Sequence, residues 1–121
     1  MTIKTKTTNV YLYATVKMLH KVAREKKAKI WRVVADILER PRRKKVAVNL
    51  SKINRLTKEN DIIVVPGKVL GGGTLDHPVV IAAFAFSESA LNKIIKVGGK
   101  ALSINELIKE NPKGSNVKII I

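Results

Sequence analysis

Residues 64–78 read Val-Val-Pro-Gly-Lys-Val-Leu-Gly-Gly-Gly-Thr-Leu-Asp-His-Pro, and they connect two apolar runs, residues 62–65 and 79–86. Both runs are short and apolar on both faces, which is typical of strands at the centre of a sheet. This stretch therefore predicts a fold organised around two buried strands and the segment that joins them.

The segment between the two runs combines a turn signal with a bare backbone. Pro66-Gly67 predicts a turn, and the three glycines at 71–73 remove the side chains that would keep another molecule at a distance. Exposed N–H groups beside Lys68 suit an anion such as a phosphate. Judged from the loop alone, a flexible connection between two strands is the favoured interpretation, because glycine is common in turns.

Periodicity and capping residues place the other elements. The N-terminal half is expected to hold a mobile basic tail at 1–8, a helix at 10–26 with Asn9 as its N-cap, a helix at 29–39 that Pro41 ends, a strand at 46–48 and a helix at 50–56 capped by Asn49. After the strands 61–65 and 79–86, we expect a helix from Ser87 to Val97 that Gly98-Gly99 ends, a strand at 100–102, a helix that opens with a Ser103–Glu106 capping box, and a strand at 117–121. The alternation predicts a mixed α/β fold behind a helical, basic N-terminal part.

The apolar positions of each helix predict which side is buried. The expected buried residues are Leu12, Val16, Leu19 and Val22 or Ala23, then Ile30, Val33, Val34, Ile37 and Leu38, then Leu50, Ile53 and Leu56, then Ala90, Leu91, Ile94 and Ile95, and finally Ile104, Leu107 and Ile108. Trp31, Phe84 and Phe86 could stack on bases, but their apolar surroundings favour the core. Phe84 and Phe86 are expected to share a strand face, because side chains alternate along a strand.

Charge is the most informative part of the composition. Lys plus Arg number 24 and Asp plus Glu number 9, for a net charge of +15 over 121 residues. Residues 1–60 carry 17 basic and 4 acidic side chains, whereas residues 61–121 carry 7 and 5. This shift does not mark a linker, so we expect one domain over 1–121, with a tail at 1–8, a basic helical part at 9–60 and a near-neutral α/β part at 61–121. An excess of cations favours a polyanionic partner, most commonly nucleic acid.

Several other classes of function are disfavoured. The chain has no cysteine and two histidines, so it lacks the ligand clusters of a metal site. Asp76-His77 lies in a loop, and no motif places a nucleophile beside it. The glycines match neither the dinucleotide-binding fingerprint nor the P-loop. The apolar stripes of the basic helices are needed for the core, which disfavours a membrane surface. We therefore expect no catalytic residue, cofactor or small-molecule substrate.

The candidate nucleic-acid contacts follow the basic residues. The densest charge is the run 40–45, and Lys17, Lys21 and Arg24 lie on or near one face of the first helix. Within residues 1–60, the predicted RNA-binding residues are Lys4, Lys6, Arg24, Lys26, Lys27, Lys29, Arg32, Arg40, Arg42, Arg43, Lys44, Lys45, Lys52, Asn54 and Arg55. The remaining candidates are Lys68, Gly71, Gly72, Gly73, His77 and Lys113, of which the glycines would let RNA approach the bare backbone.

Several segments, in their order and spacing, carry a resemblance to a known family. They are Arg40-Pro41-Arg42-Arg43, Val48-Asn49-Leu50-Ser51-Lys52-Ile53-Asn54, Val65-Pro66-Gly67-Lys68-Val69-Leu70-Gly71-Gly72-Gly73, Asp76-His77-Pro78-Val79, Phe86-Ser87, Gly98-Gly99 and Asn111-Pro112-Lys113-Gly114. From about Asn9 to the C-terminus the chain resembles the large-subunit ribosomal protein family eighteen-e of archaea and eukaryotes, a relative of bacterial large-subunit ribosomal protein fifteen.

The resemblance implies a structural, ribosomal-RNA-binding role in the cytoplasmic large subunit, as a monomer beside other ribosomal proteins and without enzyme activity. It implies a compact domain of irregular strand-strand-helix turns. It also implies RNA contact at the 40–45 run, Lys52, Arg55, Lys68 and Lys113. A free-standing RNA- or DNA-binding module outside the ribosome is the alternative.

Overall fold

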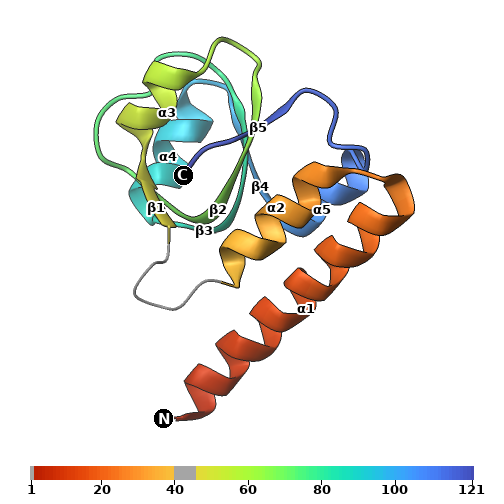
Figure 1. Ribbon diagram of the computed structural model, residues 1–121. Helices are drawn as coiled ribbons and strands as arrows, with labels where there is room; N and C mark the ends of the chain where they lie inside the picture. Colours follow the sequence, from red (N-terminus) through yellow and green to blue (C-terminus); the bar gives the residue numbers. More distant parts are fainter. Residues whose placement is uncertain (1, 40–45) are drawn as a thin grey trace.

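The computed structural model describes the backbone of residues 2–39 and 46–121, with side chains for 12–39 and 46–121. Its elements are α1 (Thr2–Lys26), α2 (Lys29–Leu38), β1 (Val46–Asn49), α3 (Leu50–Leu56), β2 (Ile62–Leu70), β3 (Val80–Phe86), α4 (Glu88–Lys96), β4 (Lys100–Ser103), α5 (Ile104–Glu110) and β5 (Val117–Ile119) (Figure 1). This arrangement confirms the predicted mixed α/β fold.

All strand pairs in the described sheet are parallel, and β2 lies at its centre. The order is β1-β2-β3-β4, and β5 pairs with β2 on the same side as β1. Along that side, β5 pairs with Ile62–Val64 and β1 pairs with Gly67–Leu70. One edge of β2 is thus shared by two short strands, one that precedes β2 in the sequence and one near the C-terminus.

The predicted turn at Pro66-Gly67 is wrong, because β2 continues through it to Leu70. The pairing of β2 with β3 shifts register between Val65 and Lys68, which is an irregularity of the strand rather than its end. Proline cannot donate a hydrogen bond to the ladder of a sheet, so within a sheet it is confined to edges and to irregularities such as this one. On its other edge, Pro66 falls between the parts of β2 that pair with β5 and with β1.

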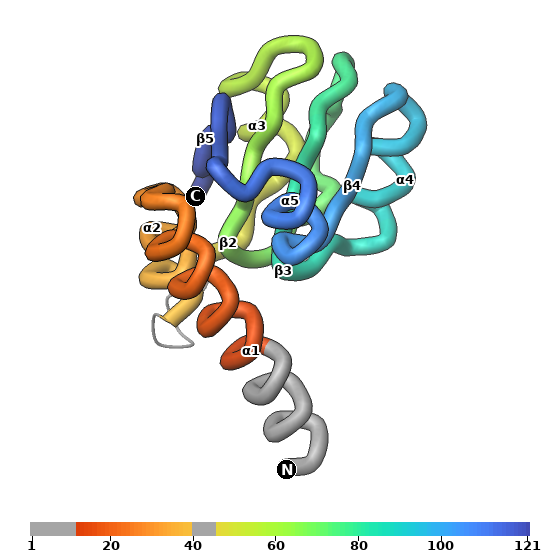
Figure 2. Tube along the Cα trace, turned by 90° about the vertical axis from the view of Figure 1, so that its right-hand side faces the viewer, coloured from red at the N-terminus to blue at the C-terminus, as the bar shows by residue number. Residues whose placement is uncertain are grey.

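The two faces of the sheet bury two separate cores. Alternation along β2 directs Ile63 and Val65 to one core and Val64 to the other. The core that contains Ile63 and Val65 also contains Leu50, Ile53, Ala90 and Ile94, and we call it the α3–α4 core. The core that contains Val64 also contains Val16, Leu19, Trp31, Val34, Ile104 and Leu107 from α1, α2 and α5, and we call it the hairpin core. Figure 1 shows α2 between α1 and the sheet, and Figure 2 shows α1 and α2 side by side. The helices α1 and α2 form what we call the helical hairpin.

The helix predicted from Val10 begins at Thr2, so the N-cap expected at Asn9 is wrong, and the backbone of residues 2–8 is helical. Residues 2–9 contain no glycine or proline, and lysine is a good helix former, so nothing in this segment stops the helix. The second helix ends at Leu38, close to its predicted end, and Pro41 lies outside the described residues.

The predicted core is largely confirmed, with three exceptions. Val33, Leu56 and Ile95 are 41%, 49% and 65% exposed. In α2, Trp31 is fully buried and takes the inward side together with Val34, Ala35 and Ile37, which turns Val33 outward. Leu56 is the last residue of α3 and Ile95 is the last but one of α4.

The two phenylalanines are half-buried, as core residues, but they do not share a face. Phe84 packs against the hairpin core and Phe86 against the α3–α4 core, at the end of β3. Two predicted caps are confirmed, since Ser87 accepts a hydrogen bond from the Ala90 N–H and Ser103 forms the complete box with Glu106.

Candidate functional site

The connection between α1 and α2 gathers cations at one end of the helical hairpin. Lys27 adopts a left-handed conformation with φ of +52°, and the Ala28 N–H donates to the Ala23 carbonyl oxygen over 3.1 Å. This is a helix C-cap of the kind that lets the chain reverse within a few residues. The basic residues of the last turn of α1 and the first turns of α2 are therefore brought to the same place.

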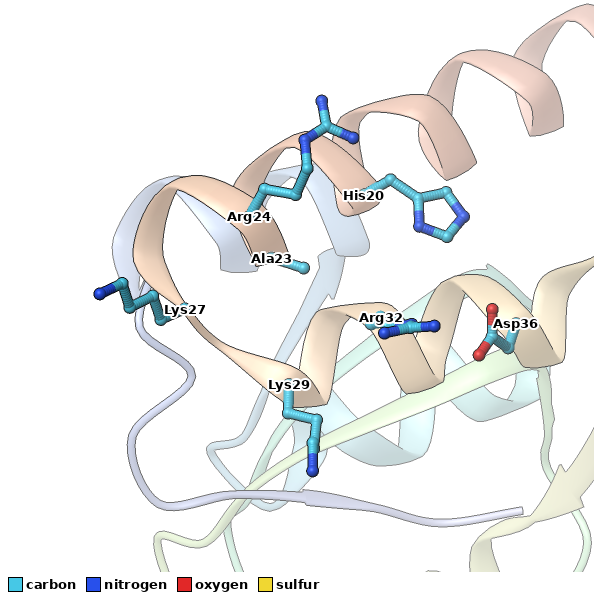
Figure 3. Close-up of a pocket in the computed structure, with 7 residues that line it drawn as sticks. All are labelled: His20, Ala23, Arg24, Lys27, Lys29, Arg32 and Asp36. Atoms are coloured by element: carbon cyan, nitrogen blue, oxygen red, sulfur yellow. The ribbon is translucent and has the colours of Figure 1, made fainter.

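These residues line a groove between the two helices, which we call the basic groove. It measures about 440 Å³ and is lined by Arg24, Lys27, Lys29 and Arg32 together with His20, Ala23 and Asp36. Figure 3 shows His20 and Arg24 on α1, Lys27 at the connection, and Lys29, Arg32 and Asp36 on α2. All four cations are exposed.

The four cations of the basic groove have no acidic partner among the described residues. In the described part, close contacts between basic and acidic side chains join His20 to Glu39, His77 to Asp76 and Lys118 to Asp61, at 3.2, 2.9 and 3.0 Å. Like charges that line one groove repel one another, and an anion in the groove would relieve that repulsion. The geometry suits a phosphate, which arginine binds in a fork and lysine as a point charge.

Lys113 lies near the same end of the hairpin. The Trp31 Nε1–H donates to the Pro112 carbonyl oxygen over 2.7 Å, and a Cβ added at Gly114 would lie 2.4 Å from Ile30 Cγ2. The loop around Lys113 is thereby packed onto the first turn of α2. Six predicted RNA-binding residues are brought to this end: Arg24, Lys26, Lys27, Lys29, Arg32 and Lys113.

One group of described residues has the composition of a metal site. The potential ligand atoms of His20, Asp36 and Glu39 lie within 4.8 Å of one another, and Asp36 and Glu39 are exposed. A structural zinc site has four closed ligands of His, Cys or carboxylate type. Three ligands, two of them exposed and beside Arg24 and Arg32, do not meet that requirement, and we assign no metal here.

The other predicted contacts lie on the opposite face of the sheet or on its strands. Arg55 and Lys68 are exposed, whereas Lys52 Nζ donates to the Ile121 backbone oxygen. Asn54 Oδ1 accepts from the Asp76 N–H over 3.1 Å, so Asn54 positions the loop after the glycines. The structure therefore separates the predicted residues into two groups. Lys4, Lys6, Arg40, Arg42, Arg43, Lys44 and Lys45 lie outside the described side chains.

The glycine loop packs closely on the protein's own side chains. An added Cβ would lie 2.1 Å from Ser89 Oγ at Gly71, 2.5 Å from Asn49 Oδ1 at Gly72, and 2.4 Å from Ser51 Cβ at Gly73, where φ is +83°. Lys93 Nζ donates to the carbonyl oxygens of Gly71 and Gly73 over 2.7 and 2.8 Å. A side chain at any of these three positions would clash with the protein itself, so internal packing explains the glycines, which was not predicted from the sequence.

The side chain of Asn49 also contacts the glycine loop. It occupies the N-cap position of α3, as predicted, but its side chain makes no capping bond. Instead, Asn49 Oδ1 accepts from the Gly72 N–H over 3.0 Å. The expected helix cap is wrong because the loop, 23 residues away, competes for the same oxygen.

His77 is held between the loop and α3. Its Nε2 lies 2.8 Å from Thr57 Oγ1 and its Nδ1 lies 2.9 Å from Asp76 Oδ1. Hydrogen bonds from the His77 ring and from Asn54 hold the pKa of the Asp76 carboxyl below its usual value. This network fixes the loop in place, and it engages both ring nitrogens of His77.

The lowered pKa of Asp76 predicts the pH dependence of this network. A carboxyl whose pKa is lower in the folded state stabilises the fold above its unfolded pKa, and that contribution is lost as pH falls through the folded pKa. Asp76→Asn should therefore be less stable than wild type at neutral pH, and the difference should shrink below about pH 4. Urea unfolding across this range checks it, and a difference independent of pH would contradict the assignment.

Tyr13 is an exposed residue that the sequence-based candidates omit. It is 67% exposed on α1, and Lys17 Nζ lies 5.9 Å from the centroid of its ring. The available signal was helical spacing, because Tyr13 is four residues before Lys17, which is four before Lys21.

The fold and the groove define a small, strongly basic α/β protein whose surface cations are available to an anionic partner. Among its described helices, none is long and apolar enough to cross a membrane. Residues 2–121 match the family model described as ribosomal protein 60S L18 and 50S L18e, and the chain belongs to this family of large-subunit ribosomal proteins.

Curated relatives agree with this membership. The chain is 47% identical over 114 residues to the large ribosomal subunit protein eL18 of Pyrobaculum aerophilum, covering 94% of this chain and 93% of the relative. It is 49% identical over 120 residues to that of Methanoregula boonei, covering 99% of each, and 57% identical over 93 residues to that of Methanococcus maripaludis, covering 77% and 78%.

The family confirms the predicted resemblance, the archaeal type and the cytoplasmic location on the ribosome. Proteins of this family are structural components of the ribosome, which confirms that the chain is not an enzyme.

Proposed function

We propose that the chain binds and stabilises large-subunit ribosomal RNA by neutralising phosphates, with the basic groove as a principal contact. The observation that supports this most directly is the absence of acidic partners for Arg24, Lys27, Lys29 and Arg32 among the described residues. Phosphate neutralisation releases counterions from the nucleic acid, and this release favours binding.

The two groups of predicted residues fit contacts on two sides of the domain. The hairpin end would take one segment of RNA, and Arg55, Lys68 and the run 40–45 would take others. The run 40–45 is proposed on its charge density alone. We further propose that the protein is a monomer within the subunit and contacts neighbouring ribosomal proteins. Co-sedimentation with large subunits in high-salt gradients would separate this function from that of a free-standing RNA- or DNA-binding module.

Salt dependence tests the basic groove. Replacing Lys27, Lys29 and Arg32 by glutamine should weaken binding to large-subunit RNA and lower the slope of log K against log salt by roughly 2 to 3 units, about 0.7 to 0.9 for each phosphate contact. Filter binding or fluorescence anisotropy at several salt concentrations measures this slope.

A matched control variant has the same net charge as the triple variant of the basic groove. Lys58, Lys96 and Lys100 are exposed and outside the predicted contacts, and replacing these three by glutamine also removes three charges. The control should change the slope by less than one unit if the position of the cations decides binding. Equal slopes for the two triple variants would contradict the proposed role of the basic groove.

A further inference from the structure

The exposed side of α1 carries one continuous row that leads into the basic groove. Tyr13, Lys17, Lys21 and Arg24 are spaced by four, four and three residues, and all four are exposed. Residues with this spacing lie on one face of a helix, and each step of four residues advances about 6 Å along its axis. The row therefore presents an aromatic ring followed by three cations.

The ring is placed for contact with another molecule. Among the described side chains, Trp31 is fully buried and Phe84 and Phe86 are half-buried in the cores, whereas Tyr13 is 67% exposed. A shallow groove of about 650 Å³ lies beside the ring, and its lining includes Val16, Met18 and Lys21. The Lys17 ammonium lies 5.9 Å from the ring centroid, within the range of a cation–π contact.

We propose that Tyr13 stacks on an unpaired nucleobase of RNA while Lys17 and Lys21 bind the phosphates next to it. The ligand class is RNA with an unstacked nucleotide, in a bulge, a loop or a single strand. Aromatic side chains beside a basic surface are the usual means of holding such nucleotides. This inference rests on the proposed RNA-binding function, and it adds a residue that contacts a base, whereas the other proposed residues contact phosphates.

The charges around the ring favour RNA over a protein partner. The row contains no acidic residue, and Glu39, which lies across the groove, is 3.2 Å from His20 Nε2. A partner at this surface must therefore bring negative charge together with a flat apolar face. A nucleotide carries both on neighbouring atoms.

The test compares two probes of equal charge with the full chain. One is a short oligoadenylate, and the other is an abasic ribose-phosphate chain of the same length. Tyr13→Leu, which keeps apolar bulk but removes the ring, should lose about tenfold in affinity for the oligoadenylate and nothing for the abasic chain. Tyr13→Phe should bind both as wild type does, and the salt slope should not change in either variant. Ile95→Ala, at a 65% exposed residue on α4, is the matched control and should leave both affinities unchanged.

The outcomes separate this inference from the proposed function. Equal binding of the oligoadenylate by wild type and Tyr13→Leu would overturn the stacking role, whatever the basic groove variants do. Normal RNA binding by Tyr13→Leu with loss of incorporation into the subunit would also overturn it, in favour of a protein contact. If Tyr13→Leu loses base-dependent affinity while the triple variant at Lys27, Lys29 and Arg32 keeps its slope, stacking stands and the basic groove fails.

Discussion

Replacing Trp31 by alanine should lower the free energy of unfolding by about 3–5 kcal/mol, the range for removing a large aromatic side chain from a core. Trp31 is fully buried in the hairpin core, where α1, α2 and α5 meet the sheet. Its Nε1–H also donates to the Pro112 carbonyl oxygen, which joins α2 to the loop that carries Lys113. Urea unfolding followed by circular dichroism measures the loss.

Two further variants separate packing from the hydrogen bond. Trp31→Phe keeps most of the packing but leaves the Pro112 oxygen without its donor, and it should cost less than Trp31→Ala. Val33→Ala lies two residues away on the same helix, at a 41% exposed position, and should cost well under half as much as Trp31→Ala. A Trp31→Ala protein no less stable than Val33→Ala would show that the hairpin core does not depend on this side chain.

Interactions between residues close in sequence were predictable. The capping box of Ser103 and Glu106 spans three residues, and its residue types alone determine its bonds. The buried side of α5 follows directly from its apolar spacing. The cations of the basic groove were candidates because they are basic, and they lie close together because all four fall within nine residues around a single helix connection.

Interactions between distant residues decided two of the predictions that were wrong, the cap at Asn49 and the turn at Pro66-Gly67. Asn49 could cap α3, but Gly72 takes its side-chain oxygen, and no local pattern indicates this. Proline followed by glycine usually marks a turn, yet β2 continues through Pro66, because it pairs with β5 before this residue and with β1 after it. That Lys113 lies near the hairpin end depends on a hydrogen bond between residues 31 and 112.

The structure divides the glycine-containing stretch into two parts with different tasks. Gly71, Gly72 and Gly73 lie against Ser89, Asn49 and Ser51, and they hold the loop on the α3–α4 side of the sheet. Lys68 is exposed within β2, and β1, which directly follows the run 40–45, pairs beside it. The pairing of β1 with β2 therefore fixes where the run 40–45 rejoins the domain.

Gly67→Val should disrupt that pairing and lower the free energy of unfolding by about 3 kcal/mol or more, the upper end for forcing extra atoms into a packed site. Gly67 pairs with Val46, and an added Cβ would lie 2.2 Å from the Val46 carbonyl oxygen, which as a backbone atom cannot move without its strand. Gly98→Ala is the control, because Gly98 has φ of +82° but open space around it, and backbone strain alone should cost about 1–2 kcal/mol. Hydrogen exchange should show loss of protection in β1 for Gly67→Val only. If β1 stays protected and the two variants are equally stable, close packing against Val46 is not the reason for glycine at this position.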